Sequence, residues 1–240
     1  MQKLIGFLFT IISFIVISNI YKIREMIYSN SYVGYLYQTS VHEFGHSIGL
    51  LHPFLYKQDP CYKLMQKTFN SSDDFFASKI KKQGKYLPKE LVNKNSVMTY
   101  SVCQGSKIKA VTQDTDIIMA SMLFKKYVRG TDINIPFALN HSLHRTTKNI
   151  EVCITNKDKI NLFQYLLVID LIEYSHEQWK RSGFNIKYRR EKCSYTPQEV
   201  RLRVASPPEK GNWSFIGASK KEITMQLVIP QNMKQLKGEF

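Results

Sequence analysis

The 240-residue sequence contains few of the residues that mark non-globular chains. Its 11 glycines and 8 prolines are too few for a collagen-like or low-complexity protein, so both classes are excluded. Hydrophobic residues make up 43% of the chain, which is enough for a buried core, so wholesale disorder is excluded as well. We expect one domain, or two small subdomains that share a cleft.

Acidic residues are also scarce. The chain has 19 Asp and Glu against 34 Lys and Arg, which gives a net charge of +15. A charge of this sign attracts nucleic acids, anionic surfaces and acidic substrates. The basic residues are scattered instead of forming a stripe, and this favours a solvated lysine-rich surface. We therefore expect contact with an anionic surface at most, and no specific recognition of nucleic acid.

The apolar run near the start is short for a membrane-spanning helix. It covers Leu4 to Ile17, about fourteen residues, and follows a basic start, which is typical of the core of a secretory signal. Lys22 and Arg24 follow closely, so an uncleaved signal anchor is the main alternative, and a buried helix of the fold is another. We predict that residues 1–20 export the chain, and that the protein is secreted or anchored to a membrane outside the cytoplasm.

Cysteine is sparse, with four residues and no Cys-x-x-Cys pair, which argues against a structural zinc site built from cysteine. An even number in an exported chain suggests two disulfides, for which three pairings exist. Because each half of the chain has the pattern of its own subdomain, we predict that Cys61 pairs with Cys103 and Cys153 with Cys193. Four ordinary buried thiols are the alternative.

The residues that carry chemistry are concentrated in the segment 42–52, which reads HEFGHSIGLLH. On a helix, His42 and His46 project from the same face one turn apart, and two neutral imidazoles at that spacing suit zinc. Gly49 ends the helix, so that the reversed chain brings His52 to the metal as a third ligand. Three protein ligands leave a fourth position for water, which is typical of a catalytic zinc (Zn²⁺) site.

The full pattern HExxHxxGxxH is much more specific than a bare HExxH. It fixes five positions, and a chance match in a chain of this length arises about once in 100,000, which disfavours an ordinary amphipathic helix. The pattern resembles the signature of the metzincin clan of zinc endopeptidases. That clan carries a methionine turn below the metal, and the sequence SVMTY at 96–100 matches it, with Met98 as the turn methionine.

This turn and Pro53 are closest to the serralysin branch, and the astacins are similar, but no Gly-rich calcium-binding repeats follow. The resemblance implies roles for two further residues. Glu43 takes a proton from the attacking water as general base, and Tyr100 ligates the resting metal or donates a hydrogen bond to the oxyanion. We therefore expect a monomeric zinc endopeptidase that acts on a protein or peptide substrate. A catalytically inactive binding module on the same scaffold, or a remnant of a truncated gene, is the alternative.

The order of the expected elements is unusual for this family. A metzincin has a twisted sheet and a long helix before its zinc helix, and here only about twenty residues separate the export segment from His42. The missing pattern follows instead, as a long amphipathic helix over 161–182 and strands near 150–154, 184–188, 200–204, 213–217 and 223–227.

We therefore expect an α+β fold of metzincin type with its halves in permuted order. Residues 21–130 form the zinc-helix subdomain, 131–149 the linker and 150–240 the sheet subdomain, which contains a twisted mixed sheet. The resemblance implies that the last strand is the edge strand over the cleft and pairs with an extended substrate through Ile223, Thr224, Met225, Gln226 and Leu227.

Overall fold

The computed structural model describes residues 32–53, 61–64, 91–100, 103, 110–131, 148–194, 196, 199–209, 213–216 and 223–232. The expected export segment 1–20 and most of the expected linker 131–149 lie outside these residues. None of the helices in the described part of the chain has the length and apolar character needed to cross a membrane.

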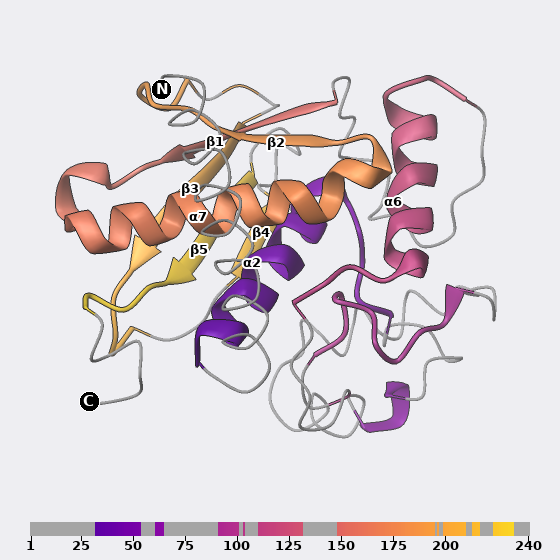
Figure 1. Ribbon diagram of the computed structural model, residues 1–240. Coiled ribbons are helices and arrows are strands. Elements are labelled where there is room, and N and C mark those ends of the chain that lie inside the picture. Colours follow the sequence, from indigo (N-terminus) through magenta and orange to yellow (C-terminus); the bar gives the residue numbers. More distant parts are fainter. Residues whose placement is uncertain are drawn as a thin grey trace, which may run out of the picture.

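The described chain is a mixed α/β structure (Figure 1). Its three α-helices are α2 (Tyr32–Ile48), α6 (Asp114–Tyr127) and α7 (Leu162–Trp179), and two short 3-10 turns flank α7. Five strands form one sheet: β1 (Asn149–Ile154), β2 (Asn185–Tyr188), β3 (Glu199–Ala205), β4 (Trp213–Ile216) and β5 (Ile223–Val228). The expected strands and the long helix are therefore present at nearly the expected residues.

The strand order in the sheet is β2-β1-β3-β5-β4. The first four of these strands run parallel, and β4 pairs antiparallel with β5. The sheet is thus mixed, as expected, but the expected edge strand is wrong. Residues 223–228 are an interior strand with β3 on one side and β4 on the other, and the antiparallel edge strand is β4. Alternating side chains identify a strand but not its neighbours in the sheet.

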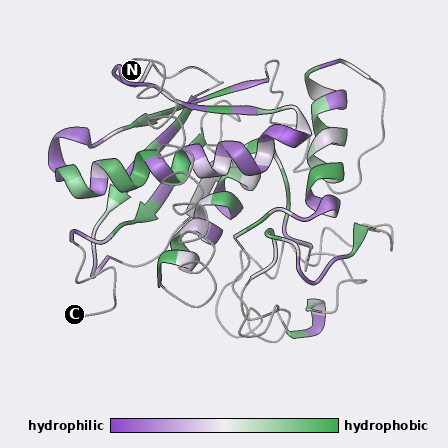
Figure 2. Cartoon of the chain, viewed as in Figure 1, coloured by the Kyte–Doolittle hydropathy of each residue, from purple (hydrophilic) through white to green (hydrophobic). Residues whose placement is uncertain are grey.

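The helices α2 and α7 cover one face of this sheet. Asn161 caps the start of helix α7, because its side chain accepts a hydrogen bond from Gln164 N–H. The helix connects β1 to its parallel neighbour β2. Its hydrophobic residues are concentrated in the first half, and hydrophilic ones follow toward its end (Figure 2). The covered face of the sheet is formed by alternating buried residues: Ile150, Val152, Ile154, Val200, Leu202, Val204, Ile223, Met225 and Leu227.

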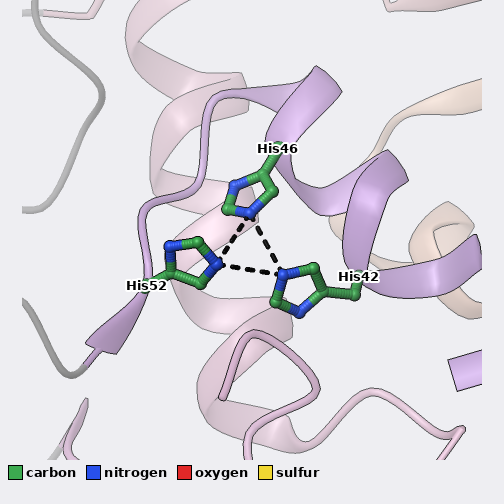
Figure 3. Close-up of side chains that lie close together, drawn as sticks. All are labelled: His42, His46 and His52. Carbon is green, nitrogen blue, oxygen red and sulfur yellow. Dashed lines mark hydrogen bonds between the residues drawn. The ribbon is translucent and has the colours of Figure 1, made fainter. Parts of the chain in front are cut away.

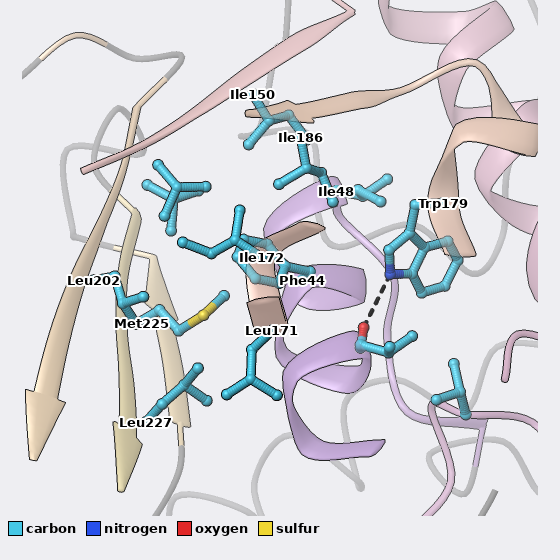
Figure 4. Close-up of a cluster of buried hydrophobic side chains, with 14 of the residues drawn as sticks. Phe44, Ile48, Ile150, Leu171, Ile172, Trp179, Ile186, Leu202, Met225 and Leu227 are labelled. Carbon is cyan, nitrogen blue, oxygen red and sulfur yellow. Dashed lines mark hydrogen bonds between the residues drawn. The ribbon is translucent and has the colours of Figure 1, made fainter. Parts of the chain in front are cut away.

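The two halves of the sequence pack against each other within one chain, because α2 lies directly on α7 and also contacts β4 and β5. Polar contacts fix this interface as well as apolar ones. The indole N–H of Trp179 donates to the Val41 carbonyl at 3.0 Å (Figure 4). The Ser40 hydroxyl donates to the Leu171 carbonyl at 3.2 Å. Since these partners lie more than 130 residues apart in sequence, the second half supplies the packing layer for the zinc-motif helix.

Both disulfides have the predicted pairing, and each lies within one half. Cys61 is bonded to Cys103 and Cys153 to Cys193, with Cα atoms 5.5 Å apart in each pair. Each bond closes a loop of about forty residues and stabilises the fold by about 3–4 kcal/mol in the chain-entropy model. Disulfides form and persist in oxidising compartments, so they indicate a location outside the cytoplasm.

We predict that Trp179→Ala lowers the free energy of unfolding by about 3–5 kcal/mol, because it opens a large cavity between α7 and α2 and removes a buried hydrogen bond. Urea denaturation of the purified protein measures this loss. Glu173→Ala, a change at an exposed position of the same helix, is the control and should cost less than about 0.5 kcal/mol. Equal stability of the two variants would show that α7 does not cover α2 in solution.

Candidate metal centre

Helix α2 and the turn that follows it bring the three motif histidines together. His42 and His46 lie one helical turn apart, and the helix ends at Gly49, whose φ of +111° lies in the left-handed region that favours glycine. The reversed chain then places His52 opposite them. The Nε2 atoms of the three rings lie 3.0 to 3.1 Å from one another (Figure 3), so the three imidazoles form one donor cluster.

The other ring nitrogens show which atoms of this cluster carry lone pairs. His42 Nδ1 lies 2.9 Å from the Val97 carbonyl oxygen, and His46 Nδ1 lies 2.8 Å from the Leu50 carbonyl oxygen. A carbonyl only accepts, so both Nδ1 atoms carry the proton and both Nε2 atoms present lone pairs to each other. Two lone pairs at 3.1 Å repel, and a shared cation relieves that repulsion.

At His42 this cation is not a proton. Burial, followed by the unfavourable interaction with a second positive charge if His46 is also protonated, lowers the pKa of His42 to about 3, so its ring is neutral at physiological pH. Neutral imidazoles with fixed Nδ1–H partners are the usual donor set for zinc, copper, nickel and iron. His42, His46 and His52 therefore form a group that fits a divalent transition metal.

Two further residues that the motif resemblance singles out lie at the same place. Glu43 is buried in α2 directly after His42. The Tyr100 ring stacks near His42, with centroids 5.7 Å apart, and near His52, with centroids 4.7 Å apart. Burial, and then the charges of Glu43 and Tyr35, raise the pKa of Tyr100 to about 12. The phenol therefore keeps its proton at neutral pH and is available as a hydrogen-bond donor beside the histidines.

Met98 packs against the backbone of α2 beneath the histidines. It is fully buried, and a Cβ atom added at Gly45 would lie 2.3 Å from Met98 Sδ and 3.0 Å from the Trp179 ring. Gly45 thus lets a sulfur and an indole touch the helix backbone between the two histidines that α2 carries. Sequence reasoning identified Met98 and placed Trp179 on the apolar face of its helix, but it missed the contact of Trp179 with α2. It also missed the two carbonyls that orient the histidines, since backbone acceptors leave no pattern in a sequence.

A second group of ligand-type residues in the described chain is Cys153, Cys193 and Glu199. Both sulfurs are used in a disulfide, and the Glu199 carboxylate accepts hydrogen bonds from the Ser194 backbone N–H at 2.9 and 3.0 Å. This group is a structural one that holds the loop after β2.

Comparisons with known proteins add no assignment to this geometry. The chain matches no protein-family model, and it matches neither a curated protein nor a solved structure. The interpretation of the centre therefore depends on its residues and their arrangement.

We predict that the metal-free protein loses stability as the pH falls below 6.5. The unfolded chain protonates His42 with a pKa near 6.5, whereas the folded chain does so only near pH 3, so folding excludes one proton in this window. Protonation of His42 in the unfolded chain therefore lowers the free energy of unfolding by about 1.4 kcal/mol for each pH unit between these two pKa values. Urea unfolding between pH 5.5 and 4 measures the slope, and His42→Gln should reduce it by about one proton. An equal slope in the variant would contradict the prediction.

Proposed function

We propose that the protein is a zinc-dependent endopeptidase of metzincin type whose two halves occur in permuted order. The observation that carries the proposal is the convergence of three imidazole Nε2 atoms beside a buried carboxylate and a protonated phenol. His42, His46 and His52 would hold the metal. A bound zinc ion supplies a Lewis acid that polarises a peptide carbonyl and acidifies a water molecule.

Two residues beside the three histidines, Glu43 and Tyr100, have the properties that peptide hydrolysis requires. Glu43 is the carboxylate next to a ligand, so it is the group placed to accept a proton from attacking water and to deliver it to the leaving amine. Tyr100 keeps its proton, so it is suited to donate a hydrogen bond to the oxygen on which negative charge develops. The resemblance of the motif to that of the metzincins implies the same two roles, and these properties support the assignment.

The sheet offers a place for an extended substrate. Strand β4 is an antiparallel edge strand, and it contacts α2, the helix that carries two of the three histidines. An extended peptide adds readily to such an edge through its main chain. We therefore assign substrate pairing to β4 in place of the strand expected from the sequence, because β5 has both of its sides occupied within the sheet.

The permuted order is supported by packing. The strand–helix–strand unit that follows residue 148 supplies the sheet and the long helix, and both lie against α2. Permutation preserves a fold when its elements can make the same contacts with different connections. The halves 21–130 and 150–240 would then be one catalytic domain, with the substrate cleft between β4 and α2.

We predict that Glu43→Gln keeps the bound zinc and the melting temperature but lowers peptide hydrolysis by about 10²- to 10⁴-fold, because it removes the proton acceptor without changing a ligand. Zinc content by elemental analysis and cleavage of casein or a quenched fluorescent peptide measure the two effects. Glu173→Gln on the exposed side of α7 makes the same chemical change away from the site and should retain full activity.

Wild-type protein with one zinc per chain and no cleavage of any peptide substrate would contradict the peptidase and support the binding module. Near-wild-type activity of Glu43→Gln would remove Glu43 from the mechanism while leaving the metal site intact. Absence of zinc from a correctly folded, disulfide-bonded wild-type protein would overturn the metal centre itself.

A further inference from the structure

Asp116 is a fully buried carboxylate to which the motif resemblance assigns no role. It is the third residue of α6, and both of its oxygens accept hydrogen bonds from the interior. The Ser96 hydroxyl donates to Oδ1 at 2.5 Å, the Val97 N–H donates to Oδ2 at 3.1 Å, and the Gln113 N–H donates to Oδ2 at 2.9 Å. Burial raises the pKa of Asp116, and these three donors oppose the rise by favouring the charged form.

The hydrogen bonds continue from Asp116 to a metal-binding histidine. Ser96 Oγ, which donates to Asp116, accepts a hydrogen bond from the Met98 N–H at 3.1 Å. This N–H belongs to the peptide group that joins Val97 to Met98. The carbonyl of the same peptide group accepts the Nδ1–H of His42 at 2.9 Å. A continuous chain of donors and acceptors thus links the carboxylate to the imidazole.

The direction of these hydrogen bonds, from the imidazole toward the carboxylate, matters for metal binding. A carboxylate at one end polarises the hydroxyl, the hydroxyl polarises the peptide N–H, and the peptide carbonyl becomes a stronger acceptor for the imidazole N–H. A stronger acceptor at Nδ1–H fixes the tautomer of His42 and raises the basicity of its Nε2 atom. Metal-binding histidines commonly donate directly to a carboxylate, and here a serine and a peptide group lie between the two.

We propose that Asp116 is a positioning residue of the metal centre, acting on His42 through Ser96 and the Val97–Met98 peptide. The inference depends on the metal site of the proposed function, but not on its peptidase activity. The link through Gln113 N–H is separate, because it caps the start of α6, whereas the link through Ser96 leads only to the turn below the histidines.

The decisive experiment is a zinc competition titration of the disulfide-bonded protein with a chromophoric chelator. Asp116→Asn should bind zinc about 10- to 100-fold more weakly than the wild type, because loss of an outer partner of a ligand has this size of effect. Asp114→Asn is the matched control. It removes the same charge from the same helix turn, but Asp114 is exposed and pairs with Arg181 at 3.2 Å, so zinc affinity should stay within about twofold.

Two readouts separate positioning from a purely structural role. The cobalt-substituted protein should show altered visible absorption in Asp116→Asn, and the downfield proton resonance of His42 Nδ1–H should move upfield. A variant that melts at a lower temperature but binds zinc with wild-type affinity and an unchanged cobalt spectrum would overturn the inference.

Ser96→Ala provides a second test, including the case in which Asp116→Asn does not fold. It removes the relay hydroxyl and leaves the Gln113 cap of α6 unchanged. We expect at least about a tenfold loss of zinc affinity, and an unchanged affinity in this variant would refute the relay. Zinc binding by the wild type with no effect in either variant would reject this inference alone, whereas a wild type that binds no zinc would reject the proposed function as well.

Discussion

The structure depends on how α2 is held by two parts of the chain that lie far apart in sequence. Trp179 of α7 donates to the Val41 carbonyl. The turn at 96–100 accepts the Nδ1–H of His42 through the Val97 carbonyl. Trp179 and Met98 meet at Gly45, where the absence of a side chain lets both touch the helix. A helix clamped in this way presents its histidines in fixed rotamers, which is the condition for a rigid donor cluster.

The same packing determines the electrostatics of the centre. Burial keeps His42 neutral and raises the pKa of Tyr100, so the centre presents lone pairs and one phenolic proton instead of mobile charges. Charges in such an interior interact more strongly than in water, and a cation among three imidazoles therefore has large effects on neighbouring groups. Under the proposed function, Glu43 and Tyr100 use this environment, while Asp116 contributes from outside the cluster through the turn.

Much of the fold was predictable because the local patterns were strong. The glycine stop at Gly49, the alternating strands and the long helix before β2 each follow from short-range rules, and the structure has them at nearly the expected residues. The two disulfides follow from the division of the chain into halves. The edge strand was predicted wrongly, because residues 223–228 have the same alternation whether they lie inside the sheet or at its border.

The sequence by itself determined the histidine cluster, since the spacing of His42, His46 and His52 and the turn at Gly49 need only a helix and a reversal to converge. It also determined which segments are strands and helices. Only the tertiary structure decided the strand order, the packing of α7 on α2 and the partner of His42 Nδ1. These depend on contacts between separate parts of the chain, such as His42 with Val97 and Val41 with Trp179, for which side-chain periodicity carries no information.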